Sequence, residues 1–319
     1  MQPWIIAVIV IAAVLAVSLL LLIFALMGDK IAFGRREDKN PNLKYFTAED
    51  FNLCAQSVSL KGGLKGVQYC DERADKKDGV VVFCHGMGPG HVAYTTEIAC
   101  FCNAGYTVFA ADSYGCNMSE GKIKGMYCGV KTAVEAVDYA RSLSENIYLV
   151  GHSWGAYSAL CASAQRKVNA VVAISAPDTP SKTIRNGAAP MLSKPFAYIL
   201  QPFWWLVNAF KFGAKGNTSA SRCAGTNNTP TLLIHGDSDG IVNKSNAAYY
   251  RAEGENITKL LVKGRAHNPY NTDNAEKLLA ELSSKLAKGC TDFSDFDFKA
   301  VTEEDPEVMC AIADFIEKH

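Results

Sequence analysis

The feature that most strongly constrains the fold of this chain is a series of six short apolar runs. Longer segments separate these runs, and several of the segments have the length of a helix. The runs are rich in Val, Ile and Leu and have the length of buried strands. Continuous apolar strands of this kind are covered on both faces, and their alternation with helices predicts a mostly parallel sheet. We therefore predict an α/β fold with strands at 80–84, 107–111, 146–150, 170–175, 231–234 and 257–262, and an antiparallel pair at one edge from residues 44–73.

The N-terminal segment differs from the rest of the chain because its first 27 residues carry no charged side chain. Between Trp4 and Met27 only Ser18 is polar. A helix over these residues would be about 36 Å long, which exceeds a hydrocarbon core of about 30 Å. A cleaved signal peptide is the alternative, but it favours a charged start, a shorter apolar run and a small-residue cleavage site. We predict a transmembrane anchor over residues 1–27.

Charges after the anchor predict its orientation. No Lys or Arg precedes the apolar segment, so the positive-inside rule places the C-terminal part in the cytoplasm. The 11 cysteines are an odd number without a pairing pattern, which indicates reduced thiols and favours the same side. The polar residues 28–43 are predicted to form a juxtamembrane linker, and residues 44–319 the folded domain. The basic residues that follow the anchor are Lys30, Arg35, Arg36 and Lys39.

The overall composition excludes several classes of protein. Hydrophobic residues make up 49% of the chain, which is too many for a disordered protein. Because 32 Lys and Arg balance 32 Asp and Glu, nucleic acid is not an expected partner. No metal-ligand spacing and no phosphate-binding Gly-x-x-x-x-Gly-Lys-Ser/Thr pattern occurs, so we expect no metal and no cofactor. No obligate protein partner is evident.

The strongest chemical signal is Gly151-His-Ser-Trp-Gly155, which lies between a predicted strand and a predicted helix over 156–165. In this context Gly-x-Ser-x-Gly forms a nucleophile elbow, a sharp turn that exposes the serine above the sheet edge. The glycines permit the strained turn. Ser153 is the predicted nucleophile.

A nucleophilic serine needs a base, and the base needs an acid that orients it. His267 is the best placed of the six histidines, since it follows the last strand and precedes a helix over 273–287. Asp237 and Asp239, which follow the strand 231–234, are both candidates for the acid. The order Ser, Asp, His along the chain fits this class of site.

The developing oxyanion would need two backbone donors. One is expected at Trp154, at the start of the helix after Ser153. The other is expected at Met87, in the loop His85-Gly-Met-Gly88, where glycines allow close approach of the backbone.

These motifs occur in the order of the α/β-hydrolase superfamily, which the chain resembles from about residue 45 to its end. The matching motifs are His85-Gly-Met-Gly, Asp112-Ser-Tyr-Gly-Cys-Asn-Met-Ser119, Gly151-His-Ser-Trp-Gly, His235-Gly-Asp-Ser-Asp239 and His267. Within the superfamily the chain is similar to the serine-aminopeptidase and monoacylglycerol-lipase-like group. The resemblance implies an α/β-hydrolase fold with Ser153, His267 and Asp239, rather than Asp237, as the triad. The chain departs from the family in a second C-terminal helix, expected near 304–317.

An insertion of about 50 residues, 178–229, separates two strands and is expected to form a helical cap. Its polar residues Gln201, Asn208, Lys211 and Lys215 leave only a narrow polar stripe. The cap's aromatic side chains are predicted to line an apolar substrate pocket, or alternatively to form the cap's own core. The pocket candidates are Phe196, Phe203, Trp204, Trp205 and Phe210.

Three functions follow from these residues. The first is a membrane-anchored serine hydrolase that cleaves carboxylic esters, including lipid esters, through an acyl-enzyme. The second is an aminopeptidase or amidase with the same triad, which is disfavoured because residues 182–229 contain no Asp or Glu to hold a free amine. The third is a non-catalytic binding protein on a hydrolase fold.

Overall fold

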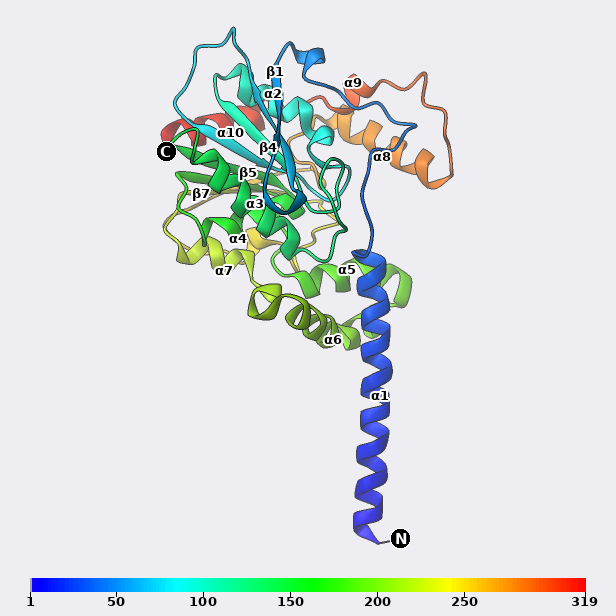
Figure 1. The fold of residues 1–319 in the computed structure, drawn as a ribbon. Coiled ribbons are helices and arrows are strands. Elements are labelled where there is room, and N and C mark those ends of the chain that lie inside the picture. The colour runs from blue at the N-terminus through cyan, green and yellow to red at the C-terminus, as the bar shows by residue number, and fades with distance from the viewer. Residues whose placement is uncertain (1) are drawn as a thin grey trace.

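An eight-stranded sheet forms the centre of the computed structural model, which describes residues 2–319 (Figure 1). The strand order is β1-β2-β4-β3-β5-β6-β7-β8. β1 and β2 run antiparallel to their neighbours, whereas the other strands are parallel, so the predicted mostly parallel α/β sheet is confirmed. The strands are β1 (Cys54–Ser59), β2 (Lys65–Cys70), β3 (Val80–Cys84), β4 (Thr107–Asp112), β5 (Ile147–His152), β6 (Ala170–Ile174), β7 (Thr231–Gly236) and β8 (Ile257–Val262).

Helices cover both faces of the sheet, as the continuous apolar strands require. One face packs on α3 (Tyr127–Ala140), α4 (Trp154–Ser163) and α7 (Ala220–Thr226) through a core that includes Val82 and Leu149. The other face packs on α2 (Thr95–Asn103) and α10 (Pro306–Lys318) through residues such as Val81. The remaining C-terminal helices are α8 (Asp273–Ala287) and α9 (Phe298–Val301). The extra C-terminal helix therefore belongs to the core, because Val308, Ile312 and Ile316 of α10 pack against the sheet.

Parallel strands place their carboxyl ends along one edge, and the candidate functional residues follow these ends. Ser153 comes directly after β5, Asp239 after β7 and His267 after β8. The helices α5 (Pro180–Leu192) and α6 (Lys194–Phe212) lie in the connection from β6 to β7, so they leave the sheet from this same edge.

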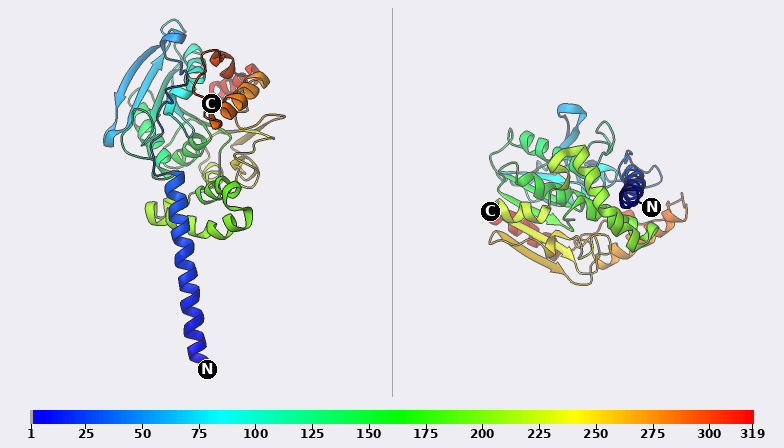
Figure 2. Two further views of the ribbon diagram at one scale, coloured as in Figure 1. Left: turned by 90° about the vertical axis from the view of Figure 1, so that its right-hand side faces the viewer. Right: turned by 90° about the horizontal axis from the view of Figure 1, so that it is seen from below.

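The apolar N-terminal segment forms one long helix, α1 (Pro3–Ala32), which projects from the folded domain (Figures 1 and 2). It is long and apolar enough to cross a membrane, and a signal sequence would meet the same criterion. The helix continues beyond Met27, so the first residues of the predicted linker are helical. The rest of that linker is tied to the domain, since Arg36 donates hydrogen bonds to the carbonyls of Asn117 and Ser119 at 2.8 and 2.9 Å.

Candidate active site

Ser153 occupies a strained turn between β5 and α4. Its φ of 55° and ψ of −118° lie in a region that non-glycine residues rarely adopt. The flanking glycines make this turn possible, because a Cβ on Gly151 would lie 2.6 Å from the Gly155 carbonyl oxygen. A Cβ on Gly155 would in turn overlap the backbone of Cys84 at the end of β3. The local sequence thus fixes the serine at the edge of the sheet.

His267 lies between Ser153 and Asp239 and is hydrogen-bonded to both. Its Nε2 accepts a hydrogen bond from Ser153 Oγ at 2.9 Å, and its Nδ1 donates one to Asp239 Oδ2 at 2.8 Å. The carboxylate also accepts the backbone N–H groups of Ile241 and Val242 at 2.9 and 2.8 Å on its other oxygen. This is the arrangement in which an imidazole can remove the proton of a serine hydroxyl.

Asp239 is held in its ionised form. Burial alone would raise the pKa of this carboxyl, but the hydrogen bond and charge of His267 and the Val242 N–H outweigh it and lower the pKa below its usual value. Asp237 takes a different role, since its Oδ1 accepts the backbone N–H of Gly264 at 2.8 Å and so links the loops that follow β7 and β8. The structure thus brings Asp239, and not Asp237, to His267.

Comparison with known proteins identifies the architecture that carries these residues. The family described as "alpha/beta hydrolase fold" matches residues 79–196, which include Met87, Ser153 and Trp154. The chain has the α/β-hydrolase fold. No curated protein matches its sequence.

Solved structures with the same fold are distant in sequence. An esterase of Pyrococcus furiosus superposes with a TM-score of 0.55 at 18% identity, covering 80% of this chain and 97% of the esterase. A proline iminopeptidase of Mycobacterium smegmatis superposes with a TM-score of 0.51 at 14% identity, covering 83% of this chain and 98% of the iminopeptidase. At these identities the similarity extends to the α/β-hydrolase fold alone.

The two expected oxyanion donors follow neighbouring strands of this hydrolase fold, Met87 after β3 and Trp154 after β5. Trp154 is the first residue of α4, where a backbone N–H has no acceptor within the helix. The N–H of the preceding loop residue, Gly86, donates instead to Tyr94 Oη at 3.1 Å. This leaves Met87 as the expected second donor, in a loop whose next residue, Gly88, has a positive φ of 145°.

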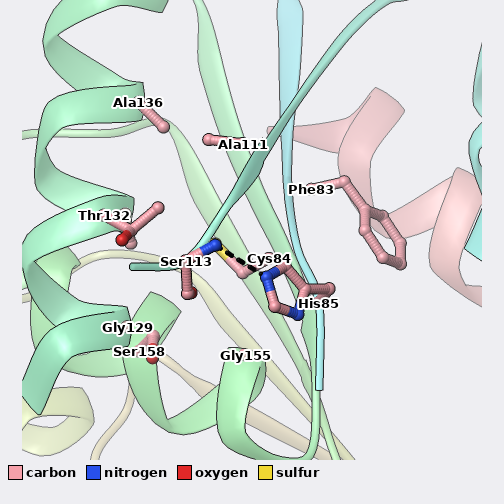
Figure 3. Close-up of a pocket in the computed structure, with 11 residues that line it drawn as sticks. Phe83, Cys84, His85, Ala111, Ser113, Gly129, Thr132, Ala136, Gly155 and Ser158 are labelled. Carbon is pink, nitrogen blue, oxygen red and sulfur yellow. Dashed lines mark hydrogen bonds between the residues drawn. The ribbon is translucent and has the colours of Figure 1, made fainter. Parts of the chain in front are cut away.

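A small cavity lies behind the elbow, between the end of β3 and the helices α3 and α4 (Figure 3). At about 10 Å³ it has room for about one water molecule, so it is not a substrate pocket. On its wall the backbone N–H of Ser113 donates to His85 Nε2 at 2.9 Å, and His85 Nδ1 donates to the Gly86 carbonyl at 2.6 Å. These bonds hold the start of the loop that carries Met87.

His152, next to the elbow serine, forms contacts that its sequence position did not suggest. Its Nε2 donates to the backbone carbonyl of His267 at 3.0 Å, and its Nδ1 accepts from Tyr94 Oη at 2.9 Å. Because burial lowers the pKa of His152 to about 3, the ring stays neutral near pH 7 and keeps both bonds. One ring thus links the Gly86 loop, through Tyr94, to the loop that carries His267.

We predict that His152 positions His267 and does not itself react. His152→Phe keeps the size of the ring but leaves the part-buried His267 carbonyl without this donor, at a cost of about 1–3 kcal/mol. We therefore expect kcat for ester hydrolysis to fall about tenfold with KM little changed. His152→Gln, which can replace the donor, should restore much of the loss. Steady-state kinetics of the two variants test this, and equal losses in both would contradict the positioning role.

The five aromatic residues proposed for a substrate pocket differ in their burial and in the helices that they contact. Trp204 is fully buried, and its indole Nε1 donates to the Ala25 carbonyl of α1 at 3.1 Å. Phe196 also contacts α1, with its ring centroid 6.0 Å from that of Phe24. Phe203 is partly buried against the core, whereas Trp205 and Phe210 are exposed, Phe210 to 96%. The structure therefore does not gather these side chains into one pocket. Some of them contact the helix α1, and others lie exposed on the outer surface of the cap.

Proposed function

We propose that the protein is a membrane-anchored serine hydrolase that cleaves carboxylic esters. The observation that carries this proposal is the pair of hydrogen bonds that His267 makes to Ser153 and Asp239, at 2.9 and 2.8 Å. Esterase neighbours with the same fold are consistent with it.

The proposed reaction passes through an acyl-enzyme. Ser153 Oγ attacks the ester carbonyl while His267 Nε2 takes the hydroxyl proton, and the N–H groups of Met87 and Trp154 stabilise the oxyanion. Collapse of the tetrahedral intermediate breaks the bond to the alcohol, which leaves with the proton from His267. Water then attacks the acyl-enzyme by the same steps, and the carboxylic acid is released.

Retention of α1 as an anchor is supported by its contacts with the cap. Ala25 is fully buried against Trp204, and Asp29 pairs with Lys211 of α6. Removal of a signal sequence near Met27 would delete Ala25 and uncover the largest fully buried side chain of the domain. We therefore propose a single-pass membrane protein, with the positive-inside rule favouring a cytoplasmic domain.

The cap favours esters over N-terminal amines as substrates. The first helix of the cap, α5, carries the buried cation Arg185. Its side chain is only 5% exposed and is hydrogen-bonded to Gln201, Asn186 and Ser245. Because residues 182–229 contain no Asp or Glu, this part of the cap offers no carboxylate to hold the ammonium group that an aminopeptidase must bind.

A substrate panel tests the proposed function. We expect the purified full-length protein in detergent to hydrolyse p-nitrophenyl esters, with little activity on aminoacyl-naphthylamides. Comparing short and long acyl chains would then define the acyl preference. Turnover of the aminoacyl amides without turnover of the esters would replace the esterase proposal with the peptidase alternative.

A further inference from the structure

Helix α6 of the cap is apolar on the face that it turns away from the protein. At 100° per residue its exposed apolar side chains fall on one side of the helix, opposite the buried Ala197, Leu200 and Trp204. We call this side the outer face of α6. Its members are Tyr198, Ile199, Trp205, Leu206 and Phe210, each at least half exposed.

The polar residues of the same helix lie toward the protein instead. Gln201 accepts a hydrogen bond from Arg185 at 2.8 Å, and Asn208 is only 1% exposed. The ammonium group of Lys211 pairs with Asp29 and donates to the Lys124 carbonyl at 2.7 Å. A helix that packs on a protein core in water normally turns its polar residues toward the solvent. The outer face of α6 is therefore suited to contact with an apolar environment.

The position of α6 along α1 indicates what lies next to the outer face of α6. The side chains of α1 that contact the rest of the protein begin at Leu21 and Leu22 and continue through Ala25, Gly28 and Asp29. The distance along the helix from Trp4 is about 26 Å to Leu21 and about 32 Å to Ala25, at 1.5 Å per residue. A hydrocarbon core of about 30 Å that starts at Trp4 thus ends at the level where α6 crosses α1.

The views of the whole chain agree with this placement. α6 lies on the side of the folded domain from which α1 projects, and beyond it only α1 continues toward the N-terminus (Figures 1 and 2). The outer face of α6 points away from the core, and the cap leaves the sheet from the edge that carries Ser153.

The charges of the cap fit an anionic membrane surface. Residues 182–229 contain no Asp or Glu, and exposed lysines flank α6, with Lys194 at its start and Lys215 just after its end. Tyr and Trp are enriched at membrane interfaces, and helices with an aromatic, apolar face and basic residues bind them in the plane of the surface. Basic residues close to the membrane further favour anionic lipids.

We propose that the outer face of α6 lies in the interface of the same bilayer that α1 spans. This rests on the membrane anchoring in the proposed function and adds a second contact with the lipid. The Ser153 edge of the sheet then faces the bilayer, so an acyl ester dissolved in the membrane can reach the site without crossing bulk water. Trp204 and the pair of Asp29 and Lys211 fix the angle between the two helices.

Photo-crosslinking of the full-length protein in vesicles of phosphatidylcholine and phosphatidylserine tests this proposal. Phe210, at 96% exposure, or Leu143, at 43%, is replaced by p-benzoylphenylalanine, and lipid adducts are measured by mass spectrometry. Leu143 is the matched control because it precedes β5 and lies at the opposite edge of the sheet. We expect lipid adducts at position 210 at least tenfold above those at position 143.

Two further measurements separate this proposal from the proposed function. The crosslinking is carried out in the Ser153→Ala background, where adducts should form equally well because no hydrolysis is involved. Carbonate extraction of the same vesicles reports whether α1 is inserted, and release of the protein would overturn both the anchor and the interfacial cap. Retention without lipid adducts at position 210, or with adducts to a second protein copy there, would overturn the interfacial cap alone.

Discussion

Ser153→Ala is expected to lower kcat for ester hydrolysis by about 10⁶-fold, to the residual rate supplied by substrate binding and the oxyanion donors. The reason is that alanine leaves His267 with no hydroxyl to activate, although its hydrogen bond to Asp239 stays intact. The measurement is kcat for a p-nitrophenyl ester, with circular dichroism and thermal unfolding to show that the variant is folded.

Ser175→Ala provides a matched control for this variant. Ser175 follows the neighbouring strand β6, is fully buried and also has a positive φ, 52° against 55° for Ser153. Both variants place an alanine at a buried or part-buried position with positive φ, while only Ser153 contacts His267. We expect Ser175→Ala to keep kcat within a few-fold of wild type. Similar losses in both variants would show that Ser153 has no special chemical role.

Asp239→Asn is expected to lower kcat by about 10⁴-fold. The ionised Asp239 accepts the Nδ1–H of His267, which leaves Nε2 free to take the proton of Ser153. An asparagine amide is neutral, so it does not stabilise the imidazolium that forms during the reaction, and its NH₂ group can favour the wrong tautomer. The measurement is kcat at pH 7.

Asp237→Asn is the control for the acid, because it lies two residues away and keeps an oxygen for the Gly264 N–H. We expect it to change kcat by less than tenfold. If instead Asp237→Asn is inactive and Asp239→Asn retains wild-type kcat, then Asp239 is not the acid of this site.

The parallel sheet and the arrangement around Ser153 could be predicted because the deciding signals are local. Strand runs such as 80–84 are recognisable by composition, and the glycines at 151 and 155 are required by the turn itself. The order of Ser153, Asp239 and His267 then follows from where the parallel strands end. Asp237 and Asp239 could be separated only by resemblance, since both follow β7 and turn geometry decides which one faces His267.

The contacts of the cap could not be predicted, because they join segments almost 180 residues apart. Nothing near Trp204 indicates that its indole would bond to Ala25 of α1. The sequence predicts that the aromatic residues of α6 turn inward, either to line a substrate pocket or to form the cap's own core. That prediction fails for Trp205 and Phe210, which lie on the outer face. The role of His152 was also missed, since its partners Tyr94 and His267 are distant in sequence.

The most direct test of the serine hydrolase is covalent labelling of the intact membrane protein with a fluorophosphonate. Such a probe reacts with a serine only when a neighbouring base activates it. We predict one adduct, located on Ser153 by peptide mass spectrometry, and no labelling in Ser153→Ala. A folded full-length protein that remains unlabelled, or that carries the adduct on another residue, would contradict the account.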